Sequence, residues 1–172
     1  MKTAIKAVVL LLCLASSAAY AAPETDVVTT KRILEQEQQS IDVASAVIRS
    51  RHELNQFLTA NHASPLHAMS SSARERFFDS LVFTDRGLGS YSYEPLVSGL
   101  SVTEIHRILS LFGVQSSMEA IPGLHASNGA ERLMLRAMER HARPNSQCYM
   151  GEKKTYCRAT RGSICPSSCE PF

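Results

Sequence analysis

Four of the five cysteines lie in the last 25 residues of this 172-residue chain, and this cluster constrains the fold more than any other feature. They are Cys148, Cys157, Cys165 and Cys169. An even number of clustered cysteines is typical of a disulfide framework in an exported protein, with three ways of pairing. A four-thiolate zinc site is the alternative, because Cys-x3-Cys is close to a usable ligand spacing. An oxidising compartment would favour disulfides over zinc.

The residues between the first two of these cysteines predict a short β-hairpin. A four-residue turn at 151–154 would place Cys148 directly opposite Cys157, at a cross-strand separation that suits a disulfide. That pairing would leave Cys165 for Cys169. The interleaved pairings stay open on the sequence alone.

The amino terminus predicts export. Lys2 and Lys6 precede the apolar run Ala7–Ala15, and Ala19-Tyr20-Ala21 fits the rule for signal-peptide cleavage after Ala21. The run is shorter than the roughly 20 residues of a membrane span, so no transmembrane segment is expected in the mature chain. Two of the 18 basic residues leave with the signal peptide, and the 16 that remain balance the 16 acidic residues. We therefore expect a secreted or periplasmic protein.

Apolar residues recur at helical spacing in four segments of the mature chain. One long helix is predicted over 30–61, and two more follow the capping boxes Ser72-x-x-Glu75 and Ser101-x-x-Glu104. A fourth begins at Asn128 and ends before Arg143-Pro144. The stretch 84–99, rich in glycine, is expected to be a loop with one short helical turn at Pro95–Ser98. Because no long alternating run of β-branched residues occurs, the predicted fold is all-α: a compact bundle of about four main helices with a small disulfide-bonded tail.

The predicted organisation has four parts in sequence order. They are a signal peptide at 1–21, a disordered lead at 22–28, a helical domain at 29–144 and a disulfide-bonded basic tail at 145–172.

No complete catalytic motif is present, so we predict no catalytic residue, no resident metal and no cofactor. His52-Glu53 begins like the zinc-protease helix motif, but Gln56 occupies the position of the second histidine. A small exported hydrolase or a metal-binding protein is the alternative function. It would require histidines such as His62, His67 and His106 to converge with Glu94.

Two surfaces are predicted to bind a partner. The first is a loop from 85 to 93 that presents two tyrosines, and the second is the basic tail, since 132–162 holds eight basic and two acidic residues. The predicted binding residues are Asp85, Arg86, Tyr91, Tyr93, Lys153, Lys154 and Arg158. For an exported protein we expect another protein or an anionic envelope component as partner, and not nucleic acid. Peripheral membrane contact is compatible with this prediction. The sequence thus predicts an exported, non-enzymatic binding or accessory protein.

Overall fold

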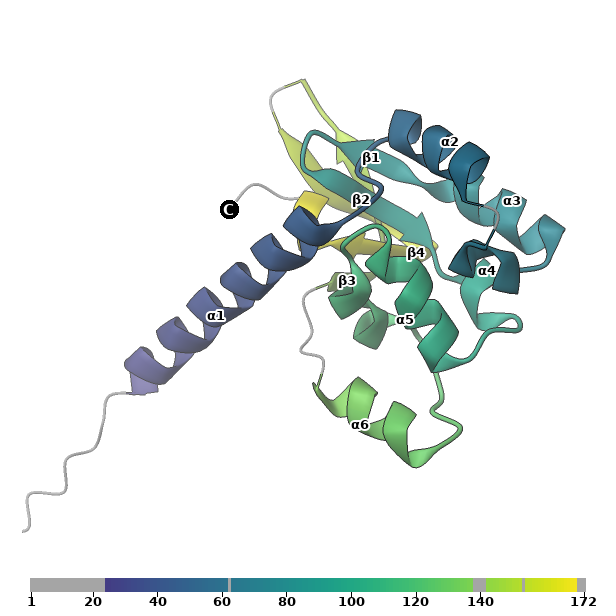
Figure 1. Ribbon diagram of the computed structural model, residues 1–172. Coiled ribbons are helices and arrows are strands. Elements are labelled where there is room, and N and C mark those ends of the chain that lie inside the picture. Colours follow the sequence, from purple (N-terminus) through teal and green to yellow (C-terminus); the bar gives the residue numbers. More distant parts are fainter. Residues whose placement is uncertain (1–23, 62, 138–141, 153, 170–172) are drawn as a thin grey trace, which may run out of the picture.

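The computed structural model describes residues 24–61, 63–137, 142–152 and 154–169. The predicted signal peptide at 1–21 lies outside these ranges. The described residues contain one four-stranded antiparallel sheet with the strand order β1-β2-β4-β3, covered by helices (Figure 1). The strands are β1 (Val82–Thr84), β2 (Gly87–Ser92), β3 (Ala142–Met150) and β4 (Thr155–Pro166).

The α-helices precede the sheet strands in the chain or lie between them. The α-helices are α1 (Glu24–Ser45), α2 (Arg51–Ala60), α3 (Ser71–Ser80), α4 (Glu94–Val97), α5 (Val102–Ser110) and α6 (Gly129–Ala137). Short 3-10 helices are η1 (Pro65–Ala68), η2 (Gln115–Ala120) and η3 (Ser167–Cys169). Within the described residues, no helix is both long and apolar enough to span a bilayer.

The sheet makes the all-α prediction wrong: the fold is a mixture of helices and an antiparallel sheet. The glycine-rich stretch 84–99 supplies the last residue of β1 and all of β2, where a loop was expected, and the short helix α4, which overlaps the helical turn predicted at Pro95–Ser98. The first five residues of β2, 87–91, are all buried, so the strand shows none of the alternation of a half-exposed strand. The following strand, β3, is largely polar and contains Pro144, which is tolerated because β3 lies at a sheet edge.

The single long helix predicted over 30–61 is also wrong, because the chain leaves the helical path after Ser45. Ser50 begins the second helix, with its Oγ accepting a hydrogen bond from the Glu53 backbone N–H at 3.2 Å. The Glu53 carboxylate in turn accepts from the Arg49 N–H at 2.7 Å. These two hydrogen bonds start α2 within a segment whose apolar residues keep a continuous helical spacing. The break in the helix before Ser50 places the Ile48 side chain in the core.

Two of the predicted helix starts are confirmed in detail. Ser101 and Glu104 form a complete capping box at the start of α5. At α6, Asn128 Oδ1 accepts from the Glu131 N–H at 2.9 Å. The buried Glu131 carboxylate also accepts from the Ser127 hydroxyl at 2.6 Å, and the hydrogen bonds from Ser127 lower its pKa.

One predicted helix start needs correction, and one predicted helix end is confirmed. The second helix begins with Ser70, not Ser72, as its cap, since Ser70 Oγ accepts from the Ala73 N–H. The last helix ends before Arg143-Pro144, as predicted, because both residues belong to β3. Its described part is Gly129–Ala137, and residues 138–141 lie outside the described residues.

The core lies between the sheet and the helices and is centred on three aromatic rings. Phe77 of α3 packs edge-on against Tyr91 of β2 and Phe112, with ring centroids 6.2 and 5.9 Å apart. All three side chains are fully or almost fully buried. Arg51, at the start of α2, lies at one edge of this core. Its guanidinium donates hydrogen bonds to the Phe78 and Leu81 carbonyls at 2.8 Å each. These contacts join α2 to the end of α3.

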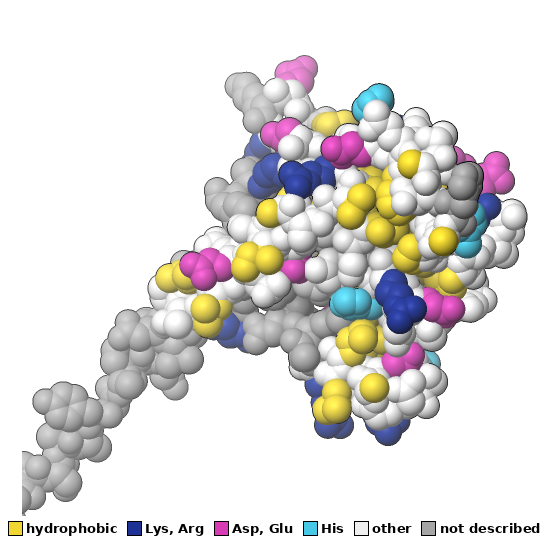
Figure 2. All heavy atoms as spheres, viewed as in Figure 1, with side chains coloured by type: hydrophobic (Ala, Val, Ile, Leu, Met, Phe, Trp, Pro, Cys, Tyr) yellow, Lys and Arg dark blue, Asp and Glu magenta, His cyan; other side chains and the backbone are white. Residues whose placement is uncertain are grey.

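The helix α1 projects away from the rest of the molecule and contacts it only near its C-terminal end (Figure 1). It begins at Glu24, within the segment predicted to be a disordered lead. Leu34 and Ile41, which the helical pattern assigns to a core stripe, are 60% and 61% exposed. Figure 2 shows hydrophobic and acidic side chains side by side along this helix. Core packing therefore does not account for the apolar side chains of α1.

The contact between α1 and α5 includes a half-buried histidine, His106, beside the buried Asp42. Desolvation lowers the pKa of His106, and the nearby Asp42 carboxylate opposes this shift only in part. Because the unfolded chain then binds a proton more readily than the folded one, stability falls as the pH drops through about 6.5. We expect the free energy of unfolding from urea titrations to decrease between pH 8 and pH 5.5. The decrease should be smaller in His106→Gln, and an identical pH dependence in that variant would contradict the assignment.

Candidate binding surface on the C-terminal hairpin

The strands β3 and β4 form a hairpin that extends beyond the helical part of the molecule (Figure 1). Cys148 lies opposite Cys157, and the Gly151 N–H donates to the Lys154 carbonyl at 3.0 Å. The predicted hairpin and its turn at 151–154 are therefore confirmed.

The hairpin does not continue straight but folds at a corner. One residue of β3, Asn145, lies opposite four residues of β4, 160–163, and Asn145 and Gly162 both adopt positive φ. The Asn145 side-chain carbonyl accepts from the Gly162 N–H and from the Tyr93 hydroxyl, both at 3.2 Å. This corner separates two parts of the hairpin. We call residues 146–159 the arm, and residues 142–144 with 164–169 the base.

The corner determines the disulfide pairing. The disulfides are Cys148–Cys169 and Cys157–Cys165, with Cα atoms 5.7 and 6.1 Å apart. Eight residues of straight strand would span about 26 Å, so the second pair closes only because the hairpin folds back. The favoured prediction of Cys148–Cys157 with Cys165–Cys169 is wrong, because the corner brings the base cysteines over the arm. The expectation that all four cysteines are oxidised to disulfides is confirmed.

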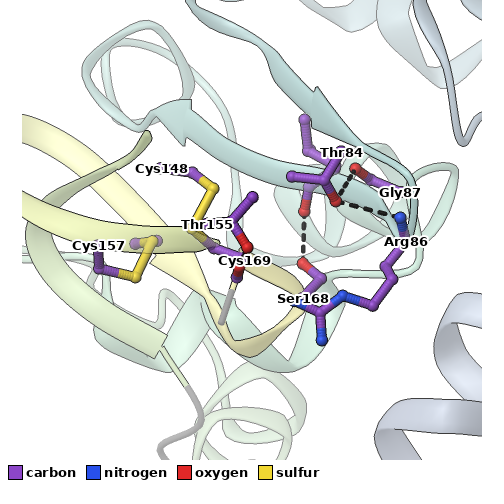
Figure 3. Close-up of a disulfide and its surroundings, with 10 residues drawn as sticks. Thr84, Arg86, Gly87, Cys148, Thr155, Cys157, Ser168 and Cys169 are labelled. Atoms are coloured by element: carbon purple, nitrogen blue, oxygen red, sulfur yellow. Dashed lines mark hydrogen bonds between the residues drawn. A yellow bond between two sulfur atoms is a disulfide. The ribbon is translucent and has the colours of Figure 1, made fainter. Parts of the chain in front are cut away.

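The Cys148–Cys169 disulfide is packed directly against β2 (Figure 3). A β-carbon added to Gly89 would lie 2.9 Å from Cys148 Sγ, so the glycine lets the strand pass beneath the sulfur atoms. The Ser168 hydroxyl donates to the Leu88 carbonyl at 2.6 Å, and the Thr155 hydroxyl donates to the Cys169 carbonyl. The base and the arm are thus both held against the strand β2.

The arm presents one face away from the disulfides. Side chains alternate along a strand, so Tyr149 shares this face with Tyr156 and Arg158, and the exposed Lys154 lies directly before β4 at the turn. The two tyrosine rings stack across the strands with centroids 6.2 Å apart and an interplanar angle of 22°. Arg158 Cζ lies 5.7 Å from the Tyr149 centroid, within the range of a cation–π contact. We call these four residues the arm face.

The arm face is accessible. Tyr156 is 42% exposed, Lys154 and Arg158 are exposed, and Tyr149 is partly buried beneath Arg158 and Tyr156. Met150, at the tip of the arm, is 67% exposed on the opposite face. Tyrosine, methionine and arginine are the residue types enriched in protein interfaces.

The two tyrosines of the predicted binding loop are not presented to solvent as expected. Tyr91 is completely buried, and a 2.8 Å hydrogen bond joins its hydroxyl to Ser117 Oγ. Burial raises the pKa of Tyr91 well above its ordinary value. Tyr93 is partly buried and holds the corner through Asn145. Tyr91 therefore belongs to the core, and the prediction that it is exposed for binding is wrong.

The other predicted binding residues are divided between two places. Asp85 and Arg86 lie in the turn between β1 and β2, where the Arg86 N–H donates to Thr84 Oγ1 at 3.2 Å. Lys154 and Arg158 lie on the arm face, and Lys153 lies outside the described residues. The structure thus brings Lys154 and Arg158 together with two tyrosines that the sequence-based prediction missed.

The residues of the alternative hydrolase or metal site do not come together in the described part of the chain. Within it, the only group of three candidate ligands at metal distance is Cys148, Cys165 and Cys169, and disulfides occupy all three sulfur atoms. His67 Nδ1 lies 3.2 Å from the Arg74 guanidinium. His62, the other predicted ligand, lies outside the described residues.

Comparisons with protein-family models, curated proteins and solved structures give no match for this chain. The choice of the arm face as the candidate site therefore depends on its own residues. The signal that could have found its tyrosines was present in the sequence, because the turn at 151–154 also places Tyr149 opposite Tyr156.

Proposed function

We propose that this protein is an exported binding protein that captures an anionic partner through the arm face. The observation that carries the proposal is the stacked pair Tyr149 and Tyr156, of which Tyr156 is exposed, with Arg158 over the Tyr149 ring and the exposed Lys154 at the adjoining turn. The partner is an acidic face of another protein or an anionic component of the cell envelope. Export is inferred from the amino-terminal segment and is compatible with the two disulfides.

The charge of the hairpin supports an anionic partner. Residues 143–161 contain five basic residues and one acidic residue, although the mature chain as a whole is neutral. Exposed charges of one sign attract an oppositely charged surface over about a Debye length and raise the rate of encounter. The tyrosine rings then supply apolar contact area with few rotatable bonds to immobilise.

The anchoring of the arm supports a role in binding. Two disulfides join the arm to the base, and Asn145 bridges Gly162 and Tyr93 at the corner. A surface held in its binding conformation loses less conformational entropy on association than a flexible one. The framework thus holds a small exposed face that contributes little to the main core.

Charge reversal on the arm face tests the proposal. The probes are phosphatidylcholine vesicles with and without phosphatidylglycerol, and poly-glutamate as a model of an acidic protein face. Each basic residue near an anionic membrane contributes about 1 kcal/mol. We therefore expect Lys154→Glu with Arg158→Glu to weaken binding to one anionic probe by more than about tenfold at low salt. The difference should shrink as salt is added.

Two further variants complete this test. Tyr149→Ala with Tyr156→Ala should weaken binding at every salt concentration, because apolar contacts are not screened. Arg132→Glu with Arg136→Glu makes the same charge change on the exposed face of α6 and should change binding much less. Equal losses from the α6 and arm variants would show that only net charge matters. Unchanged binding by both arm variants would refute the proposal.

A further inference from the structure

Both disulfides connect the arm to the base, and their sulfur atoms form one cluster. Cys148 and Cys157 belong to the arm, whereas Cys165 and Cys169 belong to the base. The Sγ atoms of Cys148, Cys165 and Cys169 lie within 4.8 Å of one another. Cys165 Sγ is therefore near both sulfur atoms of the disulfide to which it does not belong.

Burial differs among the four cysteines. Cys148, Cys165 and Cys169 are at most 2% exposed, and Cys157 alone is partly exposed. An external thiolate therefore has the easiest access to Cys157. Register favours a second pairing, because Cys148 and Cys157 lie directly opposite each other across the strands.

We propose that the four cysteines form a thiol-exchange site at which an external thiol converts the pairing to Cys148–Cys157 and Cys165–Cys169. This conversion removes both disulfide connections between the arm and the base. In the new pairing one disulfide lies within the arm and the other within the base, and no covalent bond joins the two parts except the backbone at the corner. The arm then turns about Asn145 and residues 160–163, where the backbone already departs from regular strand.

The exchange is redox-neutral, and each step is a thiolate attack on a disulfide. The external thiolate bonds to Cys157 Sγ, which breaks Cys157–Cys165 and releases the Cys165 thiolate. That thiolate attacks Cys169 Sγ, breaks Cys148–Cys169 and releases the Cys148 thiolate. Finally, Cys148 attacks Cys157 Sγ in the mixed disulfide and returns the external thiolate. Two disulfides are present before and after, and the external thiol is a catalyst.

Tryptic peptides report this change by mass. Trypsin separates the cysteines into three peptides, one with Cys148, one with Cys157 and one with both Cys165 and Cys169. The sites between them follow Lys154, Arg158 and Arg161. The observed pairing holds all three peptides in one cross-linked product. The exchanged pairing gives a two-peptide product and a single peptide with an internal disulfide.

The experiment incubates the whole protein with a mixture of reduced and oxidised glutathione, quenches with acid and maps the peptides without reduction. We expect the two-peptide product to appear, with an initial rate about tenfold higher at pH 8 than at pH 7, since the thiolate fraction rises about tenfold. Persistence of the three-peptide product until full reduction would overturn the proposal. Fragmentation that shows Cys148–Cys165 would overturn the proposed end point.

A variant isolates the central step. Cys157→Ser leaves Cys165 as a free thiol beside Cys148–Cys169, and iodoacetamide then labels whichever thiol is free. We expect the label on both Cys165 and Cys148, with at least about a tenth on Cys148. Label on Cys165 alone would overturn the exchange. These measurements do not involve a binding partner, so their outcome is independent of the proposed function.

Discussion

We expect replacement of Tyr91 by alanine to lower the free energy of unfolding by about 3–5 kcal/mol, the range for removing a large buried aromatic side chain. The Tyr91 ring is completely buried and packs edge-on against Phe77, and its loss leaves a cavity beside the central strand. Urea denaturation followed by circular dichroism measures the change. A decrease below about 1 kcal/mol would show that the ring is not part of the core.

The conservative variant separates the ring from its hydroxyl. Tyr91→Phe keeps the packing and removes only the hydrogen bond to Ser117, whose hydroxyl still donates to the Val114 carbonyl. A net cost of about 1 kcal/mol is expected for one lost hydrogen bond. Burial also raises the pKa of the Tyr91 hydroxyl, so its phenolate absorbance should not appear in the folded protein at the pH where exposed tyrosines ionise.

This result bears directly on the predicted tyrosine loop. A variant that replaces both Tyr91 and Tyr93 by alanine should lose stability, and any loss of binding in it would not identify an interface. Tyr93 adds to the effect because its hydroxyl donates to Asn145 at the corner of the hairpin. The arm variants at Tyr149 and Tyr156 are the informative ones, since those side chains lie outside the main core.

Local signals predicted several parts of the fold correctly. The capping box at Ser101 is confirmed. Gly113, in the turn that follows α5, adopts a positive φ (+67°), a backbone conformation that favours glycine. Gly113 is required for a second reason that the sequence does not show. A β-carbon there would lie 2.5 Å from the Asp42 carbonyl oxygen, so the glycine also lets α1 approach. The break before Ser50 was missed because the apolar spacing continues through it.

The sheet could not be predicted because its strands lack strand-like patterns. β2 is buried along 87–91 and uses two glycines, which suggest a loop when tertiary contacts are unknown. β3 and β4 pair across the turn at 151–154, which was predicted, whereas β4 joins β2 through Tyr91 and Ile164, which are far apart in sequence. The local hairpin was therefore predictable and its membership of a larger sheet was not.

The candidate site was also predictable only in part from the sequence. Lys154 and Arg158 were selected from charge alone, and the position of Arg158 on one face with two tyrosines follows from the confirmed register. The disulfide pairing was not predictable, because it depends on the corner at Asn145. Nothing local in the sequence indicates that four residues of β4 lie opposite this one residue.

Gly89 is a sensitive position because β1 and the Cys148–Cys169 disulfide both lie close to it, and we expect Gly89→Ala to destabilise the protein by about 2 kcal/mol or more. The added methyl group would lie 2.8 Å from Thr84 Cγ2 and 2.9 Å from Cys148 Sγ. Neither neighbour is the free end of a flexible side chain. Thr84 lies on the paired strand β1, and Cys148 is held by its disulfide to Cys169.

Gly99→Ala is the matched control, because no heavy atom lies within 4 Å of the β-carbon position there and the residue is exposed. Its stability in urea should match that of the unchanged protein to within about 0.5 kcal/mol. If Gly89→Ala were equally stable, the strand and the disulfide would not be in close contact. If the methyl group instead prevents Cys148 from reaching Cys169, thiol titration of the unfolded protein will find free cysteines in Gly89→Ala and none in the control. That outcome would show that the glycine in β2 is needed for the disulfide that anchors the arm.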